Sequence, residues 1–361
     1  MRRGRSLSKV GKSVLKLRGR QWRALSKVDR EATVELCFRY WRRRGFPYYS
    51  LSDDDIVEDY RQLELVDSRR ILIGGEIQMS MVGVRLANFF HPQMWEVPVR
   101  RAHTPLERFH DDAKLRNLIR KALTIWPDRF TVNDSNLRRM LKTFSRTAGV
   151  SNFRPTAAKA IYDRYSGNGD TVLDFSAGYG GRMLGCLPLN RRYIGIDPCA
   201  AQVGGLKRML TKLKRLVQLK ARAEIIMGCA EEVLPTIRAN SASLVFSSPP
   251  YFDHEKYSDE PTQSYLRYPR YDEWLEQFIE RVICQSRRVL KPGGFLVLNV
   301  ADVEDYSVAR DVERICSRSY AARGQFRLRL GRKPYLKHRS RLTYKHEPVL
   351  VFQKVASNAY G

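Results

Sequence analysis

Four consecutive residues, Ser248, Pro249, Pro250 and Tyr251, combine side chains and backbone that suit a planar heterocyclic ligand. They follow an apolar run at residues 243–246 that is typical of a buried strand. Two prolines end a strand because they cannot donate hydrogen bonds to a sheet, and they stiffen the backbone. The Ser248 hydroxyl and the Pro249 carbonyl would accept both hydrogens of an exocyclic amino group, while the ring stacks on Tyr251. Taken alone, the tetrapeptide is equally compatible with a rigid loop after a strand.

A glycine-rich turn lies upstream, after another predicted strand. Residues 171–175 have the composition of a short strand, residues 182–187 have a helical pattern, and residues 176–181 connect them. Gly178 and Gly180 permit tight turns and the close approach of a ligand. The following helix N-terminus offers free N–H groups to a carboxylate or phosphate. This arrangement predicts a nucleotide-binding strand–turn–helix unit.

Two further predicted strands continue this pattern. Residues 192–196 lead to Asp197, an acid placed to bind a ribose diol. Residues 223–227 lead to a turn, at 228–231, that could flank an adenine ring. A dinucleotide-dependent dehydrogenase is the natural competitor. However, the turn is not a G-x-G-x-x-G sequence, no hydride-transfer residues are visible, and the tetrapeptide has no role in such an enzyme.

In this order, the motifs resemble those of class I S-adenosylmethionine-dependent methyltransferases that modify amino groups of DNA bases. The resemblance covers roughly residues 150–355. It implies direct methyl transfer from S-adenosylmethionine, with catalytic residues Ser248, Pro249, Pro250 and Tyr251. The segment at 152–158 resembles the part of the family that closes over the methionine end of the cofactor. The implied cofactor-binding residues are Phe153, Arg154, Pro155, Thr156, Asp174, Phe175, Ser176, Ala177, Gly178, Gly180, Asp197, Pro198, Cys229, Ala230 and Glu231.

The succession of strands and helices predicts an α/β fold. The resemblance implies a Rossmann-like seven-stranded methyltransferase sheet with helices on both faces. Residues 295–300 are expected to form its fifth strand, and residues 326–330 and 348–352 a closing hairpin. We divide the chain into a basic flexible arm at 1–30, a mainly helical region at 31–149 that could recognise DNA, the catalytic domain at 150–355 and a tail at 356–361.

The helical region is expected to contain helices at 31–44, 56–65, 107–124 and 135–146. Ser52 is predicted to cap the second helix, and the acids at 53–55 to complement its dipole rather than bind a metal. In the catalytic domain, residues 252–271 are predicted to form a long functional loop over the target base. A helix at 274–290 follows this loop.

The charge of the chain points to a polyanionic partner. The formal net charge is +27, with fifteen Lys and Arg against three acids in residues 1–44, and nine against none in residues 323–345. Such an excess favours phosphate binding, and the aromatic residues among the second cluster suit base stacking. No apolar run is long enough to span a bilayer. The candidate nucleic-acid contacts are His254, Lys256, Tyr257, Arg332, Lys333, Lys337, Arg339 and Arg341.

The expected function is methylation of an exocyclic amino group in double-stranded DNA, and the resemblance implies cytosine N4, because serine at the first tetrapeptide position is more frequent in cytosine-N4 enzymes of this family. Adenine N6 methylation, RNA base methylation, and nucleic-acid binding by an inactive methyltransferase fold stay as alternatives. Cys199 follows the second strand rather than the fourth, so it is not the nucleophile of a carbon-5 methyltransferase. Six scattered cysteines without a C-x-x-C pair predict no metal site and a reducing, cytoplasmic location. For an enzyme that acts on DNA, we expect association with the nucleoid.

Overall fold

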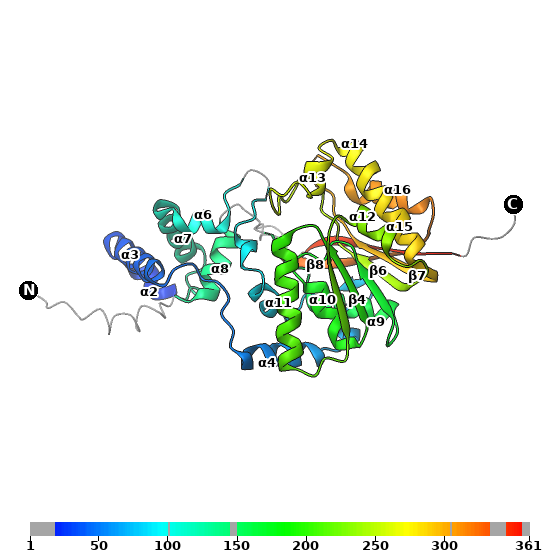
Figure 1. Ribbon diagram of the computed structural model, residues 1–361. Helices are drawn as coiled ribbons and strands as arrows, with labels where there is room; N and C mark the ends of the chain where they lie inside the picture. The colour runs from blue at the N-terminus through cyan, green and yellow to red at the C-terminus, as the bar shows by residue number, and fades with distance from the viewer. Residues whose placement is uncertain (1–18, 100–101, 145–149, 304, 333–343, 356–361) are drawn as a thin grey trace, which may run out of the picture. The chain divides into compact units, whose positions relative to one another are not determined.

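The computed structural model describes residues 19–99, 102–144, 150–303, 305–332 and 344–355 (Figure 1). Its contacts divide the chain into two compact units, Met1–Tyr49 with Pro92–Val150, and Ser50–His91 with Ser151–Gly361. Residues 50–91 therefore cluster with the sheet rather than with the helices that flank them in sequence. Within the described ranges, no helix is long and apolar enough to cross a membrane.

The first unit is helical. Val34, Cys37, Phe38 and Trp41 are buried on one face of its first long helix, as their spacing predicts. The helix expected at 107–124 is two helices instead, because the Asp111 side chain accepts a hydrogen bond from Lys114 N at 2.9 Å and caps the second one. The elements of the first unit are α2 (Gly19–Ala24), α3 (Lys27–Arg44), η2 (Pro92–Trp95), α6 (Pro105–His110), α7 (Asp112–Ile125) and α8 (Asp134–Thr143).

Many basic side chains of this unit are held by its own acids. Arg120 pairs with Glu31 at 2.7 Å and Arg116 with Glu35 at 2.9 Å, which joins α7 to α3. The Arg116 guanidinium also lies 3.5 Å from the centre of the Phe38 ring. Part of the positive charge of this unit, on α7, therefore stabilises helix packing.

The second unit contains a nine-stranded sheet in the order β1-β2-β8-β9-β7-β6-β3-β4-β5. The last seven strands of the chain, β3 to β9, lie side by side in the order β8-β9-β7-β6-β3-β4-β5. Strand β9 is antiparallel to both of its neighbours. The prediction of seven strands is therefore wrong in number: a short β1–β2 hairpin adds to the edge strand β8. The strands are β1 (Leu72–Ile73), β2 (Glu76–Ile77), β3 (Thr171–Asp174), β4 (Arg192–Asp197), β5 (Arg222–Met227), β6 (Ala242–Ser247), β7 (Leu290–Asn299), β8 (Ala321–Arg332) and β9 (Tyr344–Gln353).

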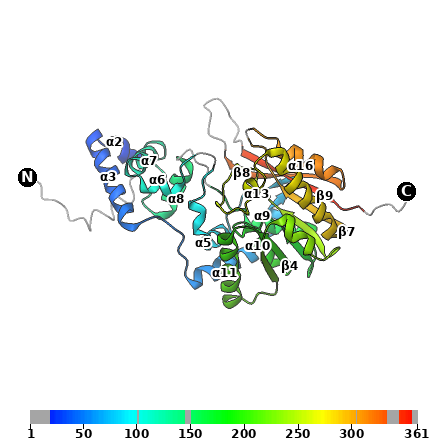
Figure 2. The same cartoon turned by 45° about the horizontal axis from the view of Figure 1, so that its top comes forward.

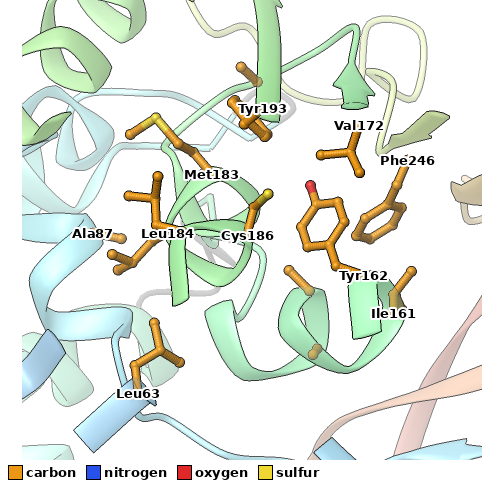
Figure 3. Close-up of a cluster of buried hydrophobic side chains, with 14 of the residues drawn as sticks. Leu63, Ala87, Ile161, Tyr162, Val172, Met183, Leu184, Cys186, Tyr193 and Phe246 are labelled. Carbon is orange, nitrogen blue, oxygen red and sulfur yellow. The ribbon is translucent and has the colours of Figure 1, made fainter. Parts of the chain in front are cut away.

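Successive residues of the central strands enter two different cores. Val172 packs in one hydrophobic cluster and Leu173 in the other, because side chains alternate between the faces of a strand. Tyr162 and Phe246 meet in the first core at 5.4 Å between ring centres (Figure 3). Helices thus cover both faces of the sheet, with α9, α10 and α11 on one side and α12, α15 and α16 on the other (Figure 1). Figure 2 shows α16 beside the β8–β9 pair.

The helices of this unit are α4 (Asp53–Glu64), η1 (Ser68–Arg70), α5 (Val84–Phe89), α9 (Pro155–Tyr165), α10 (Gly181–Cys186), η3 (Leu187–Leu189), α11 (Ala200–Leu216), α12 (Ala230–Val233), η4 (Leu234–Thr236), α13 (Ser264–Arg267), α14 (Tyr271–Trp274), η5 (Leu275–Glu280), α15 (Arg281–Val289) and α16 (Val308–Ser317). The helix predicted at 274–290 is confirmed, with η5 as a π-helical turn within it.

Helix α4 is fixed at both ends. Ser52 and Asp55 exchange hydrogen bonds of 3.1 and 3.0 Å in a capping box, which confirms the predicted cap. At the other end, the Lys159 ammonium donates to the carbonyls of Leu63, Glu64 and Val66 at 2.7–2.9 Å. This lysine satisfies carbonyl groups that a helix C-terminus leaves without partners.

Candidate active site

The carboxyl end of β3 is organised by Asp174, whose side chain is completely buried. Its Oδ2 accepts hydrogen bonds from Arg182 Nε at 2.7 Å and Tyr193 Oη at 2.8 Å. Its Oδ1 accepts from Ser247 Oγ at 2.8 Å and from Ser176 N at 3.3 Å. Asp174 therefore joins three neighbouring strands and the glycine-rich turn, and its oxygens are occupied by the protein itself.

The glycine-rich turn has two residues in the left-handed region, Gly178 at φ +56° and Gly180 at φ +76°. At Gly180, an added Cβ would lie 2.4 Å from Met209 Cε and 2.8 Å from Leu206 Cδ2. The backbone conformation favours glycine at this position, and a larger residue would also displace the ends of these two α11 side chains. Gly178 is not crowded in this way, and its N–H faces the acid of the next strand.

That acid is Asp197, at the end of β4. Its Oδ2 accepts from Gly178 N at 2.7 Å and its Oδ1 from Cys199 N at 3.0 Å. Burial raises the pKa of Asp197 to about 6, against the lowering effect of these two backbone donors. A carboxylate has about four acceptor positions, so two stay available for the hydroxyl groups of a ribose.

The segment before α9 packs directly against the turn. Asn152 Oδ1 accepts from Gly181 N at 3.0 Å, and a Cβ on Gly181 would lie 1.8 Å from the Phe153 carbonyl oxygen. The Phe153 ring meets Phe246 at 5.4 Å. Arg154 is buried and burial lowers its pKa, while its Nη2 has no hydrogen-bond partner. The segment before α9 therefore contains a buried guanidinium nitrogen without a hydrogen-bond partner.

Other residues of the predicted cofactor set make contacts within the protein, and their contact with a cofactor stays a prediction. Thr156 is buried at the start of α9, beside Pro155 in its first turn, and donates to Ser80 O at 3.4 Å. Glu231 is occupied by Arg267 at 3.3 Å and by Tyr268 Oη at 3.2 Å. The second core holds Phe175 and Ala230, and Ala177 N donates to Ile196 O at 2.8 Å.

The tetrapeptide begins immediately after β6. Ser248, Pro250 and Tyr251 are half-buried, Pro249 is buried, and Tyr251 Oη lies 3.5 Å from the Asn299 carbonyl oxygen. Burial, the charge of Glu347 and the charge of Glu255 all raise the pKa of Tyr251. The end of β6 borders β3, so the tetrapeptide and the glycine-rich turn lie at the same edge of the sheet.

Phe252 holds the tetrapeptide in place. It has φ +57°, which is unusual for a bulky residue, and its side chain is buried. The ring packs between Tyr271, Trp274 and Tyr306, at 5.3–5.7 Å between ring centres. This aromatic anchor turns the chain from β6 into the following loop.

The loop at 252–271 contacts the turns after β4 and β5 as well as the tetrapeptide. Glu260 accepts from Ala200 N at 3.2 Å, Thr262 Oγ1 donates to Pro198 O at 3.3 Å, and Cys229 Sγ donates to Thr262 O at 3.5 Å. These contacts bring the loop against the turns after β4 and β5, where an adenosine is expected. Sequence patterns gave no sign of them, because they depend on which strands are neighbours.

The first part of the loop lies between the two halves of the site. Tyr257 Oη donates to the Glu255 carboxylate, and its ring meets that of Tyr179 in the glycine-rich turn at 6.1 Å. Tyr257 thus makes contacts within the protein, and its contact with nucleic acid stays a prediction. Lys256 lies 5.9 Å from the Tyr265 ring, and His254 is half-buried, with its backbone N donating to Tyr251 O at 3.3 Å.

Several buried polar atoms around the site have no hydrogen-bond partner. They come from the cofactor segment, the glycine-rich turn, α11 and the loop: Arg154 Nη2, Tyr179 Oη, Gln202 Oε1 and Gln263 Nε2. Buried polar groups without partners are uncommon, so these atoms are candidates for hydrogen bonds to a polar ligand. Together with Asp197, they offer donors and acceptors of the kinds that the ribose, adenine, amine and carboxylate of S-adenosylmethionine require.

The basic segment near the C-terminus is described in part. Glu76 pairs with Arg327 at 3.2 Å, with Arg329 at 2.5 Å and with His346 at 3.2 Å, which leaves a net positive charge at the β8–β9 pair. Arg332 ends β8. Lys333, Lys337, Arg339 and Arg341 lie outside the described residues.

Comparisons with known proteins point to one class. Residues 242–360 match the N6/N4 methyltransferase family, described as DNA methylase. A type II methyltransferase of Bacillus subtilis, M.BglI, is 37% identical over 76 residues, which is 21% of this chain and 19% of that protein. The type II beta methyltransferase M.BslI of a Bacillus species is 27% identical over 99 residues, 27% of this chain and 10% of the relative.

The chain thus covers about a fifth or less of the length of these two relatives. Among solved structures, a SAM-dependent O-methyltransferase from Thermotoga maritima aligns over 58% of this chain and 69% of its own, at 13% identity and a TM-score of 0.38. That alignment is too weak to bear on function. The family match supports an amino-methyltransferase of the N6/N4 class, and it includes the tetrapeptide.

Proposed function

We propose that this protein transfers a methyl group from S-adenosylmethionine to the exocyclic amino group of a flipped base in double-stranded DNA, with cytosine N4 as its target. The observation that carries the proposal is the position of the tetrapeptide, on the strand next to β3 and at the edge where Asp197 and the glycine-rich turn lie. The N6/N4 methyltransferase match over the same tetrapeptide supports the reaction class.

In this proposal the bound cofactor supplies an electrophilic methyl group on a sulfonium. Asp197 would accept hydrogen bonds from the ribose hydroxyls, and the unpaired Arg154 Nη2 would donate to the carboxylate. Asp174 contributes indirectly, since its oxygens are already occupied. It fixes Arg182 and Ser247, and through them the turn and the start of the tetrapeptide.

The tetrapeptide would act on the base. An amino group attached to an aromatic ring is a poor nucleophile, because its lone pair is delocalised. Hydrogen bonds from both amino hydrogens to Ser248 Oγ and Pro249 O favour a more tetrahedral nitrogen, which stabilises the transition state more than the ground state. Tyr251 would stack on the base, and alignment of the nitrogen with the methyl group lowers the barrier further.

Cytosine is proposed over adenine because Ser248 is a neutral acceptor, and the resemblance associates serine at this position with cytosine. Duplex DNA is proposed because of the net charge of +27 and the positive β8–β9 pair. The target must then leave the helix, at a cost of a few kcal/mol.

The test is mass spectrometry of nucleosides from DNA and RNA after expression in a host without DNA methylation. We expect N4-methylcytosine in DNA. N6-methyladenine alone would keep the mechanism and change the target base. Methylated RNA with unmodified DNA would favour an RNA methyltransferase. The absence of any modification in DNA and RNA would refute the proposal.

A further inference from the structure

Glu255 occupies a position between the two halves of the site that the proposed roles above do not use. Its carboxylate accepts a hydrogen bond from Tyr257, and the Tyr257 ring lies edge-on to Tyr179 in the glycine-rich turn. Glu255 follows the tetrapeptide by only four residues, and its charge acts on Tyr251 as well as on Tyr179. The carboxylate is therefore connected to the glycine-rich turn through Tyr257, and it lies four residues beyond the tetrapeptide.

The surroundings of Glu255 favour a proton acceptor. Burial raises its pKa, the Tyr257 hydrogen bond lowers it, and the negative charge of Glu347 on β9 raises it. Tyr179, Tyr251 and Tyr257 are the other titratable groups that face it, and the pKa of each is raised first by burial. These tyrosines stay neutral near neutral pH, so the carboxylate is the stronger base of the group.

The proposed reaction needs such an acceptor. When an amino nitrogen that carries two hydrogens gains a methyl group, it becomes cationic and must lose one proton to give the neutral product. The Ser248 hydroxyl is neutral and the Pro249 carbonyl is a weak base, so neither keeps that proton. A general base near the nitrogen contributes about 10²- to 10⁴-fold in rate when its pKa suits the working pH.

We propose that the Glu255 carboxylate accepts the proton that the target amino group loses on methylation. The inference rests on the proposed function. The nitrogen lone pair forms the new N–C bond, the methyl–sulfur bond breaks, and its electron pair stays on sulfur. After the methyl group has transferred, one of the two amino hydrogens leaves its hydrogen bond to Ser248 or Pro249, and its proton passes to a Glu255 oxygen. The neutral carboxyl group, which is half-buried, then releases the proton to water.

The experiment compares single-turnover methylation rates of the wild-type protein, Glu255→Gln and Tyr257→Phe between pH 5 and pH 9, with S-adenosylmethionine at a concentration that saturates each protein at every pH. Asp259→Asn is the matched control, since it neutralises an exposed carboxylate of the same loop. In the wild type we expect the rate to rise with pH through the pKa of Glu255 and then to level off. Glu255→Gln should be at least about 100-fold slower and lose this dependence.

Tyr257→Phe separates a proton acceptor from a merely structural residue. It removes the hydrogen bond that lowers the pKa of Glu255, so the rising part of the profile should move to higher pH. A second readout requires no activity: infrared titration of the protein alone, in which the carboxyl signal lost in Glu255→Gln should titrate above about 4.3, the ordinary value for Glu.

The outcomes distinguish the two proposals. If the wild type methylates DNA and Glu255→Gln matches Asp259→Asn in rate and pH profile, the role of Glu255 is wrong and the proposed function stands. A carboxyl signal that titrates at or below the ordinary Glu value would also overturn this role. If the wild type transfers no methyl group to any nucleic acid, the proposed function fails, and this inference fails with it.

Discussion

Asp174 Oδ1 accepts a hydrogen bond from Ser247 Oγ at 2.8 Å, which joins the acid at the end of β3 to the residue directly before the tetrapeptide. Both side chains are completely buried. The other Asp174 oxygen accepts from Arg182 and Tyr193, so one carboxylate connects β3, β4, β6 and α10. The cofactor half and the base half of the site are thus held in register by a buried polar network.

This network predicts a large, non-additive effect on stability. Arg182→Met would leave the Asp174 carboxylate buried without its cationic partner, and we expect a loss of about 3–5 kcal/mol in the free energy of unfolding. Asp174→Asn should lower the free energy of unfolding by less in the Arg182→Met variant than in the wild type. The difference between these two effects, which is the coupling of the two residues, should be about 0.5–3 kcal/mol. Denaturant titrations of the two single variants and the double variant measure this coupling. Additive effects would show that the pair does not act as a unit.

Asp197 predicts a pH dependence of cofactor binding. Its pKa is raised to about 6, so it is protonated below that pH and ionised above it. Ribose hydroxyls donate to the ionised form, so affinity for S-adenosylmethionine should rise as the pH increases through about 6 and then stay constant. Asp197→Asn should weaken binding at pH 8 by roughly 10- to 100-fold and remove the pH dependence. Calorimetry that finds equal affinities in a folded variant would remove Asp197 from the site.

Local patterns in the sequence were sufficient to predict the strands that position this site, because each has a β-rich apolar run. They also predicted that Asp197 and the tetrapeptide lie at the ends of strands, since both directly follow such runs. The β1–β2 hairpin was missed because each strand has two residues, too few for a periodic signal. Two features depend on contacts between residues far apart in sequence, which local periodicity does not report. They are the hydrogen bonds that occupy both Asp174 oxygens and the contact of Glu260 with the N-terminus of α11.

The backbone conformation of Phe252 predicts that a glycine variant at this position is more stable than an alanine variant. Phe252→Ala loses the packing against Tyr271, Trp274 and Tyr306 and keeps a side chain at φ +57°, so it should lose about 3–5 kcal/mol. Phe252→Gly loses the same packing but relieves the backbone strain, and we expect it to be about 1 kcal/mol more stable than the alanine variant. Thermal unfolding of both variants compares them. An alanine variant that is the more stable one would contradict the strained backbone.

The basic N-terminal segment predicts a salt dependence of DNA binding. Residues 1–20 carry eight Lys and Arg and no acid, and each phosphate neutralised adds about 0.9 to the slope of log K against log salt. Deletion of residues 1–20 should reduce that slope without abolishing methylation of a short duplex. A variant with the eight residues replaced by Gln is the control for length and should match the deletion. Equal slopes for all three proteins would mean that the segment does not bind phosphate.

The central claim is methyl transfer to an exocyclic amino group held by Ser248 and Pro249. Its most direct test uses purified protein, S-adenosylmethionine with a deuterated methyl group, and duplex DNA, followed by mass spectrometry of the nucleosides. We expect labelled N4-methylcytosine with the wild type, and in Ser248→Ala a strong loss of product with cofactor affinity nearly unchanged. Label found only in 5-methylcytosine, or a Ser248→Ala variant as fast as the wild type, would contradict the account.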